Sequence, residues 1–377
     1  MRNRYLDLLR AVATVRVVVY HLTGWTALTV VFPAMSVMFA LAGSMMAASL
    51  DRHGPFAVER RLRRLLPSLW VLAVIAVPAM MIGGMAWDSR LLLWAFPLVD
   101  PPAGGGWMQA LSATWYLRDF LWLVLLSPIA LPIFRRFPIP TLLIPYLGLA
   151  VVTLAGLHPH PVLHDLALYG GPWLLGFAHH DGLLRRRRLI GLAAVLAVAA
   201  GFWVVTHPGP RGYDLNDIPL GNALWSAAFV LVALRFAPKI RAYRLIAVLN
   251  ARALTIYLWH VPIIVAVSQL ALARTWPIFG AAGIGWRMPV VFALVACAVL
   301  LSGWVEDLAA GRRASFVPGI VGPTEQQDVR HDLHTGTGPA HVLRPRVREH
   351  AGRIPDLGRE HDLPAGRGAE QLPGVRG

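Results

Sequence analysis

Three ionisable residues, Asp7, Arg10 and His21, lie in an N-terminal stretch that is otherwise apolar enough to enter a bilayer. Ionisable groups at membrane depth are costly and often mark functional sites, and a histidine can exchange a proton near neutral pH. Residues 10 and 21 are eleven positions apart, about three turns plus 20° on an α-helix, so they share one face about 16 Å apart. Asp7 precedes Arg10 at the spacing of a helix ion pair. The alternative is structural, with His21 in a buried hydrogen-bond network or an interhelical crevice.

Two further segments combine apolar and ionisable residues. ERRLRRLLPSLW has four arginines, among them Arg60, Arg61 and Arg64, just before an apolar stretch. Such arginines either anchor a helix end at the cytoplasmic face or form a cluster whose forked donors match phosphate oxygens. LTIYLWHVPII has Tyr257 and His260 inside an apolar stretch. Both segments favour a functional role for His21, because buried polar groups then recur along the chain.

A metal site is a weaker candidate. The segment HPHPVLHD contains His158, His160, His164 and Asp165, whose side chains are metal ligands in other proteins. Prolines flank the histidines and nothing in the sequence holds them together, so we expect no metal. The single cysteine, Cys297, excludes an intramolecular disulfide and a cysteine-based metal site.

The elements that must position these residues are membrane helices. Of 377 residues, 56% are hydrophobic and 15% are charged, and the apolar residues gather in runs long enough to cross about 30 Å of hydrocarbon. We therefore predict an all-α, polytopic integral membrane protein with about ten transmembrane helices. The expected spans are 7–28, 30–50, 66–84, 115–134, 140–157, 163–178, 189–206, 219–236, 247–271 and 288–308.

Arginine is distributed unevenly between the expected spans. The N-terminus and every second connection are rich in arginine, whereas the other connections are rich in Gly, Pro, His and Asp. This pattern predicts that both termini are cytoplasmic. It also explains the net charge of +15 without a nucleic-acid partner. We expect a multi-pass protein of the cytoplasmic membrane, and nothing in the sequence defines its oligomeric state.

The C-terminal part differs in composition from the rest. Residues 311–377 are rich in Arg, acidic residues, Pro and Gly, and Phe316 is their only aromatic residue. Such a segment buries too little apolar surface to offset the loss of chain entropy on folding. We therefore predict a membrane domain over residues 1–310 and a disordered tail over residues 311–377.

The ionisable residues belong to short motifs. The first span contains D-x-x-R-x10-H, formed by Asp7, Arg10 and His21. The pattern R-x-x-R-x-x-P begins at Arg61, before the third span. Each of these motifs is short, and alone it is weak evidence of a particular function.

Two aromatic motifs follow them. The W-[FY]-L segment of TWYLRDFLWLVLLSPIAL contains Trp115 and Tyr116, and a Y-L-W-H segment contains Tyr257 and His260. The four motifs, in this order, resemble those of the acyltransferase-3 group of integral membrane acyltransferases. Many members carry a glutamate shortly after the W-[FY]-L segment; here Asp119 is the candidate for its role. The resemblance extends over about residues 4 to 308.

The resemblance implies transfer of an acyl group, commonly acetyl, from cytoplasmic acyl-CoA to a hydroxyl of a sugar or a secreted small molecule. No bound cofactor is implied, since acyl-CoA is a co-substrate. His21 is then the expected general base, with Arg10 and Asp7 on the same helix. Arg60, Arg61 and Arg64 are expected to bind the anionic end of coenzyme A.

Two alternatives remain at this stage. A transporter or flippase for a lipid-linked sugar or small anion would also bury cations, although inverted repeats are not evident. A catalytically inactive relative of the same fold is the second. Within the acyltransferase hypothesis, a small secreted metabolite and a polysaccharide are both open as acceptors.

Overall fold

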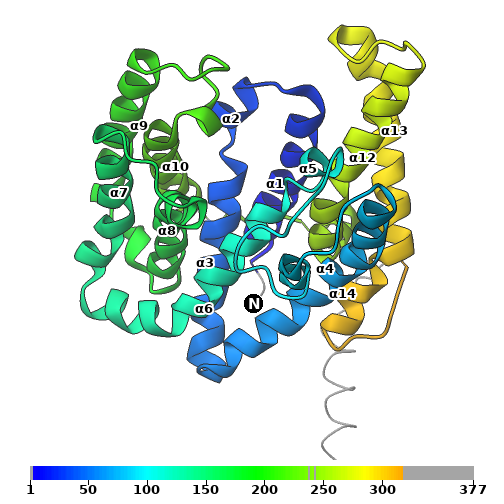
Figure 1. The fold of residues 1–377 in the computed structure, drawn as a ribbon. Helices are drawn as coiled ribbons and strands as arrows, with labels where there is room; N and C mark the ends of the chain where they lie inside the picture. The colour runs from blue at the N-terminus through cyan, green and yellow to red at the C-terminus, as the bar shows by residue number, and fades with distance from the viewer. Residues whose placement is uncertain (1–2, 237, 242, 317–377) are drawn as a thin grey trace, which may run out of the picture. The chain divides into compact units, whose positions relative to one another are not determined.

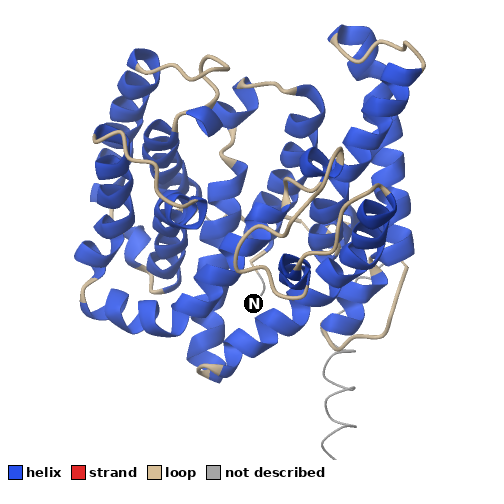
Figure 2. Ribbon diagram, viewed as in Figure 1, coloured by secondary structure: helices blue, strands red, loops and turns tan. Residues whose placement is uncertain are grey.

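The computed structural model describes residues 3–236, 238–241 and 243–316. This part of the chain folds into helices joined by turns and loops, and it contains no β-strand (Figures 1 and 2). The long helices are α1 (Arg4–Thr23), α3 (Ala34–His53), α4 (Phe56–Ile82), α6 (Thr114–Arg136), α7 (Pro138–Leu154), α8 (Pro161–His180), α9 (Arg188–Thr206), α10 (Pro219–Ala233), α12 (Ala253–Ala273) and α13 (Gly280–Ser302). The short elements are α2 (Ala27–Val31), α5 (Trp107–Ala110), α11 (Arg244–Ala251), α14 (Trp304–Ala309) and the 3-10 helices η1 (Ser89–Trp94), η2 (Leu183–Arg185) and η3 (Leu215–Asp217).

Six helices of the described part are long and apolar enough to cross a membrane. They are α3 together with α2, α4, α6, α9, α12 and α13. Helices α7 and α10 are apolar but shorter. Helix α1 has 20 residues but carries four charged residues, Arg4, Asp7, Arg10 and Arg16. The prediction of an all-α, polytopic membrane protein is therefore confirmed, with six spans identified by length and hydropathy.

Helix α3 lies at the centre of the bundle and packs closely against α8. A Cβ atom on Gly43 would lie 2.2 Å from the carbonyl oxygen of Trp173, and one on Gly176 would lie 2.1 Å from that of Ala40. Glycines at these two positions allow the backbones of α3 and α8 to approach, as small residues do between membrane helices.

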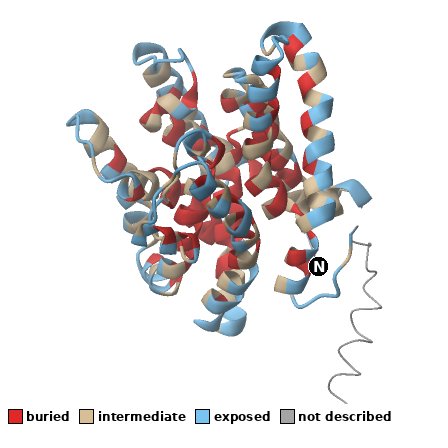
Figure 3. Cartoon of the chain, turned by 45° about the vertical axis from the view of Figure 1, so that its right-hand side comes forward, coloured by how far each residue is buried: buried red, intermediate tan, exposed pale blue. Residues whose placement is uncertain are grey.

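Burial distinguishes the central helices from the peripheral ones (Figure 3). In the most apolar stretch of α3, 72% of the residues are buried, against 11% in α9 and 17% in α13. Apolar side chains such as Val198, Phe202 and Leu301 are exposed on these peripheral helices. An exposed apolar helix face is suited to lipid, so α9 and α13 are expected at the lipid boundary.

Two predicted boundaries differ from the structure in ways that matter for the site. The first span was expected to end at residue 28, but α1 ends at Thr23 because Gly24 adopts a left-handed conformation with φ 68°. The third was expected to begin at residue 66, but α4 begins at Phe56. His21 therefore lies in the last turn of α1, and the arginines from Arg60 to Arg64 lie in the first turns of α4.

The membrane bundle ends shortly after α14. Arg312 forms an ion pair with Asp307 at 2.9 Å, and the carbonyl of Ser315 accepts a hydrogen bond from Arg252. From residue 317 onwards, the tail predicted over residues 311–377 lies outside the described residues.

Candidate active site

His21 is an exposed side chain at the end of α1. Its ring lies 5.1 Å from the ring of His260 on α12, measured between centroids. The charges of Arg16 and Arg211 act on it electrostatically. The helix cap at Gly24, whose N–H donates to the Tyr20 carbonyl, fixes the turn that carries His21. His21 is thus held by a fixed helix end while its ring can be reached from outside the protein.

His260 is buried directly beside it, with no exposed surface. Its Nδ1 lies 2.6 Å from the carbonyl oxygen of Tyr257, one turn earlier in α12. Its Nε2 is buried and has no hydrogen-bond partner among the described residues. The two histidines, 239 positions apart in the sequence, therefore meet because α1 and α12 pack together.

A row of aromatic side chains continues from His260 into the bundle. The rings of His260 and Tyr257 have centroids 5.4 Å apart, and those of Tyr257 and Tyr116 are 4.7 Å apart. The hydroxyl of Tyr257 donates to the carbonyl of Ala113 at 3.1 Å, just before α6. The row thus joins α12 to α6 and brings two predicted motifs, W-[FY]-L and Y-L-W-H, into contact.

Arginines from two helices lie at the far end of this row. The charges of Arg10 and Arg61 both act on Tyr116, and they also act on each other. Nη2 of Arg10 lies 2.8 Å from Sδ of Met45. The first turns of α1 and α4 therefore bring two guanidinium groups together, and such a pair attracts an anion with several oxygen atoms.

The other predicted residues near this pair take different positions. Arg64 is exposed and lies within electrostatic reach of Arg61 on one side and of Glu306 and Arg312 on the other. Arg60 is exposed, and its charge acts on His53 instead. The carbonyl of Asp7 accepts a hydrogen bond of 2.7 Å from Asn250, which ties α1 to α11.

Asp119 belongs to a separate charged cluster around Arg118. The guanidinium of Arg118 is buried and binds Asp119 at 2.9 Å, Asp100 at 2.5 Å and also Asp165. Burial raises the pKa of the Asp100 carboxyl above its ordinary value, while the charge of Arg118 acts against this shift. Oδ2 of Asp119 has no hydrogen-bond partner among the described residues. Three carboxylates around one arginine hold the start of α6, the start of α8 and the loop after η1 together.

Three other residues singled out in the sequence, Trp115, His160 and His164, have structural contacts. Trp115 stacks on Tyr169 with centroids 5.2 Å apart, at the interface of α6 and α8. In the HPHPVLHD segment, Nδ1 of His160 accepts from the backbone N–H of Val162 at the start of α8, and His164 contacts Asp165. Two histidines of this segment, His160 and His164, thus take part in contacts at the start of α8.

Sequence reasoning missed the loop that covers the end of α1. The hydroxyl of Tyr20 donates to Asp214 at 2.7 Å and accepts from Arg211 at 2.8 Å. Arg211 also pairs with Asp217 at 2.7 Å. Because Tyr20 and Asp214 are 194 positions apart, no local pattern could reveal this contact, which fastens the loop between α9 and α10 beside His21.

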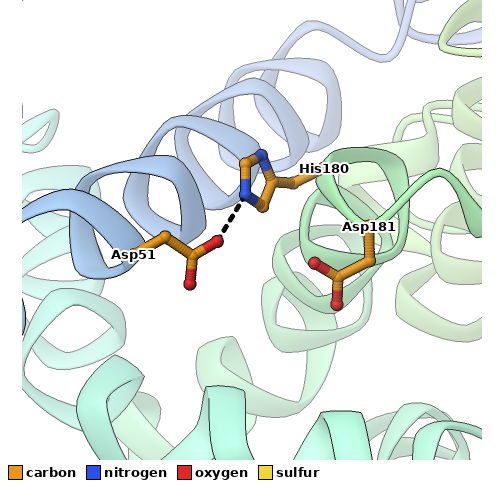
Figure 4. A group of neighbouring side chains, drawn as sticks. All are labelled: Asp51, His180 and Asp181. Carbon is orange, nitrogen blue, oxygen red and sulfur yellow. Dashed lines mark hydrogen bonds and ion pairs between the residues drawn. The ribbon is translucent and has the colours of Figure 1, made fainter. Parts of the chain in front are cut away.

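A second missed cluster joins the ends of α3, α6 and α8. Asp51 receives a hydrogen bond of 2.8 Å from His180, and Asp181 lies beside them (Figure 4). Arg135 binds both carboxylates, at 2.7 Å to Asp51 and 2.8 Å to Asp181. Although two carboxylates and a histidine could hold a metal ion, the guanidinium of Arg135 already occupies both carboxylates.

A cavity of about 460 Å³ lies on another side of α12. It is lined by Met80 and the glycine-rich loop before α5, and by Pro262, Val265 and Ala266 of α12. These three α12 residues point roughly opposite to His260 on the helix, at 100° per residue. The cavity is therefore separated from the two histidines by α12 itself.

Comparison with known families places these observations in context. A family model described as an acyltransferase domain, that of the acyltransferase 3 family, matches residues 3–305. No match to the chain was found among curated proteins or among solved structures. The matched residues include α1, α4, α6 and α12, which carry both histidines and the arginine pair. The protein is a multi-pass membrane enzyme that transfers acyl groups, and it belongs to the acyltransferase 3 family.

Proposed function

We propose that this enzyme transfers an acyl group, which we take to be acetyl, from acyl-CoA to a hydroxyl of a carbohydrate or a secreted small molecule, with His21 as the general base. The observation that carries the proposal is the continuous row from His21 through His260, Tyr257 and Tyr116 to the arginines at the other end of α1. A base that can be reached from outside and an anion-binding pair are thus linked through one layer of packed side chains.

The chemistry needs only a base and a well-placed thioester. The thioester is already activated, so the harder task is to make an alcohol nucleophilic. As the hydroxyl oxygen attacks the carbonyl carbon, a ring nitrogen of His21 takes its proton. The new C–O bond forms, the C–S bond breaks, and the thiolate of coenzyme A receives the proton from His21. Exposure of His21 favours it over the fully buried His260 as the group that meets the acceptor.

Arg10, Arg61 and Arg64 are the proposed contacts for the phosphates of acyl-CoA. Arg61 lies among positive charges, those of Arg10, Arg64 and Arg52, and a cluster of this kind is stabilised by a polyanion. His21 lies about 16 Å from Arg10 along α1, a separation that the extended pantetheine arm can cover. The charge of Arg60 acts on His53, so we propose a smaller contribution from it.

We further propose that all ten long helices cross the cytoplasmic membrane and that the N-terminus and the C-terminus both lie on the cytoplasmic side. The arginine-rich connections support this topology, because positive residues favour the cytoplasmic side. The arginine pair then faces cytoplasmic acyl-CoA, and His21 faces the outer half of the bilayer. Reporter fusions after α3 and after α9 should give opposite orientations, and equal orientations would contradict the topology.

The decisive experiment is mass spectrometry of surface glycans and secreted metabolites from a host that lacks this chain. The host is complemented with the wild type or with His21→Ala, and membrane insertion of both is checked by immunoblotting. We expect an added acyl mass with the wild type only, and the modified molecule then identifies the acceptor.

The other outcomes are equally informative. If His21→Ala restores the acyl mass fully, His21 is structural and the proposed mechanism is wrong. If neither chain changes acylation but a glycan or metabolite shifts between cell and medium, the proposed reaction is wrong for this chain.

A further inference from the structure

The protonation pattern of His260 follows from its contacts. Nδ1 lies 2.6 Å from the carbonyl oxygen of Tyr257, and a carbonyl oxygen can only accept a hydrogen bond. Nδ1 of the neutral ring must therefore carry the proton, and Nε2 must carry the lone pair. Nε2 is an acceptor that is buried and has no partner among the described residues. A buried acceptor of this kind is costly unless it is satisfied.

The ring contact between His21 and His260 makes His21 the candidate donor for this acceptor. The ring of Tyr257 also lies beside His260, but its hydroxyl donates to the carbonyl of Ala113 at 3.1 Å. The ring of His21 lies 5.1 Å from that of His260, and its side chain is exposed and can rotate. Hydrogen bonds of catalytic groups are often long without substrate and tighten in the complex.

We propose that His260 is a positioning residue that accepts a hydrogen bond on Nε2 from one ring N–H of His21 and so fixes the tautomer of the base. This inference rests on the proposed function, in which His21 takes the proton of the acceptor hydroxyl. One ring nitrogen of His21 is then held as a hydrogen-bond donor to His260. The lone pair is therefore kept on the other ring nitrogen, which faces the hydroxyl that receives the acyl group.

The same contact serves throughout the transfer step. When His21 takes the hydroxyl proton, it becomes an imidazolium whose second N–H remains bonded to Nε2 of His260. The proton that was taken passes to the thiolate sulfur, so His260 neither gains nor loses a proton. His260 has no exposed surface, which is compatible with a group that never touches the acceptor.

The test is the rate of label transfer from [14C]acetyl-CoA in membrane vesicles of the complemented host. For His260→Leu, which has no acceptor, we expect kcat to fall about 100-fold with KM for acetyl-CoA within about twofold, since a general base contributes about 10²- to 10⁴-fold. His260→Gln offers a side-chain carbonyl in place of Nε2 and should recover most of this loss, to within about tenfold of the wild type.

A double variant tests whether His21 and His260 act together as a unit or contribute to the rate independently. The variant with both His21→Ala and His260→Leu should be no slower than His21→Ala alone, because residues that act as a unit are not additive. Ile263→Ala, which shortens another side chain of α12, is the control for packing. All variants are compared by gel filtration in detergent, so a misfolded protein is recognised.

Each result bears on one proposal only. If the wild type is active and His21→Ala is not, but His260→Leu keeps the wild-type kcat, the inference about His260 is wrong and the proposed function stands. Equal losses in folded His260→Gln and His260→Leu, or multiplicative losses in the double variant, would also overturn it. If wild-type vesicles transfer no label above those of the empty host, the proposed function fails first.

Discussion

Two arginines at the same end of the bundle have opposite surroundings. Arg135, at the end of α6, is enclosed by Asp51 and Asp181, with four hydrogen bonds of 2.7 to 3.0 Å to their carboxylates. Arg61, in the first turns of α4, lies among the positive charges of Arg64, Arg10 and Arg52. The positive-inside pattern of the sequence does not distinguish the two, because it counts both as cytoplasmic cations.

The difference separates arginines used for structure from arginines suited to a ligand. The fork of Arg135 is filled by two carboxylates that come from α3 and α8, so it joins three helix ends. The positive charges of the arginines around Arg61 repel one another, and a bound polyanion would reduce that repulsion. Arg118 and Arg211 resemble Arg135, because aspartates also surround them.

The largest effect that this comparison predicts is on Arg61. We expect Arg61→Ala to raise KM for acyl-CoA about 10- to 100-fold, because hydrogen bonds to charged groups contribute about 1.5–3 kcal/mol. The KM for the acceptor should change little. Steady-state kinetics in vesicles, with each substrate varied in turn, measures both values.

Arg63→Ala is the matched control on the same helix. Arg63 is an exposed arginine paired with Glu59 at 2.6 Å, one turn earlier. Its removal should leave KM for acyl-CoA within about twofold, since exposed pairs of this kind contribute about 0.3–0.5 kcal/mol. Equal increases of KM in both variants would mean that total positive charge matters and that the position of Arg61 does not.

For Arg135 we expect a smaller effect than for Arg61, and we expect it on the stability of the fold. Arg135→Ala leaves the carboxylates of Asp51 and Asp181 facing each other, but the cluster is partly exposed, so we expect a loss of about 1 kcal/mol. A loss of that size lowers the thermal midpoint of the detergent-solubilised protein by about 2–4 °C. KM for acyl-CoA should not change, and a rise like that of Arg61→Ala would erase the distinction between the two clusters.

Much of the fold could be predicted because membrane helices leave a local signal. Runs of apolar residues predicted the long helices, and in the structure Arg10 of α1 and Arg61 of α4 lie within electrostatic reach of each other. The exact ends were harder. Gly24 ends α1 through its backbone conformation, and the arginine-rich start of α4 is helical although it is not apolar.

The contacts between distant segments could not be predicted in the same way. Asp51 and Arg135 are 84 positions apart, and His21 and His260 meet across nearly the whole membrane domain. Such pairs depend on which helices pack against each other, and a hydropathy pattern does not contain that information. The unpartnered Nε2 of His260 is visible only once the Tyr257 carbonyl is in place, so the sequence could suggest His260 as a candidate but could not suggest its role.

The smallest predicted effect concerns Arg211, the arginine of the loop beside His21. Its hydrogen bonds lower the pKa of the Asp217 carboxyl below the ordinary value. A carboxyl with a lowered pKa in the folded state stabilises the fold above its ordinary pKa, about 4, and loses that contribution as the pH falls through the folded-state pKa. Arg211 is half-exposed, so we expect less than about 1 kcal/mol. Thermal midpoints at pH 7 and pH 3 should therefore differ slightly more in the wild type than in Asp217→Asn, which has no carboxyl to titrate. If both proteins lose the same number of degrees, the pair with Asp217 adds nothing to the stability of this loop, and only the contacts of Arg211 with Asp214 and Tyr20 hold it in place.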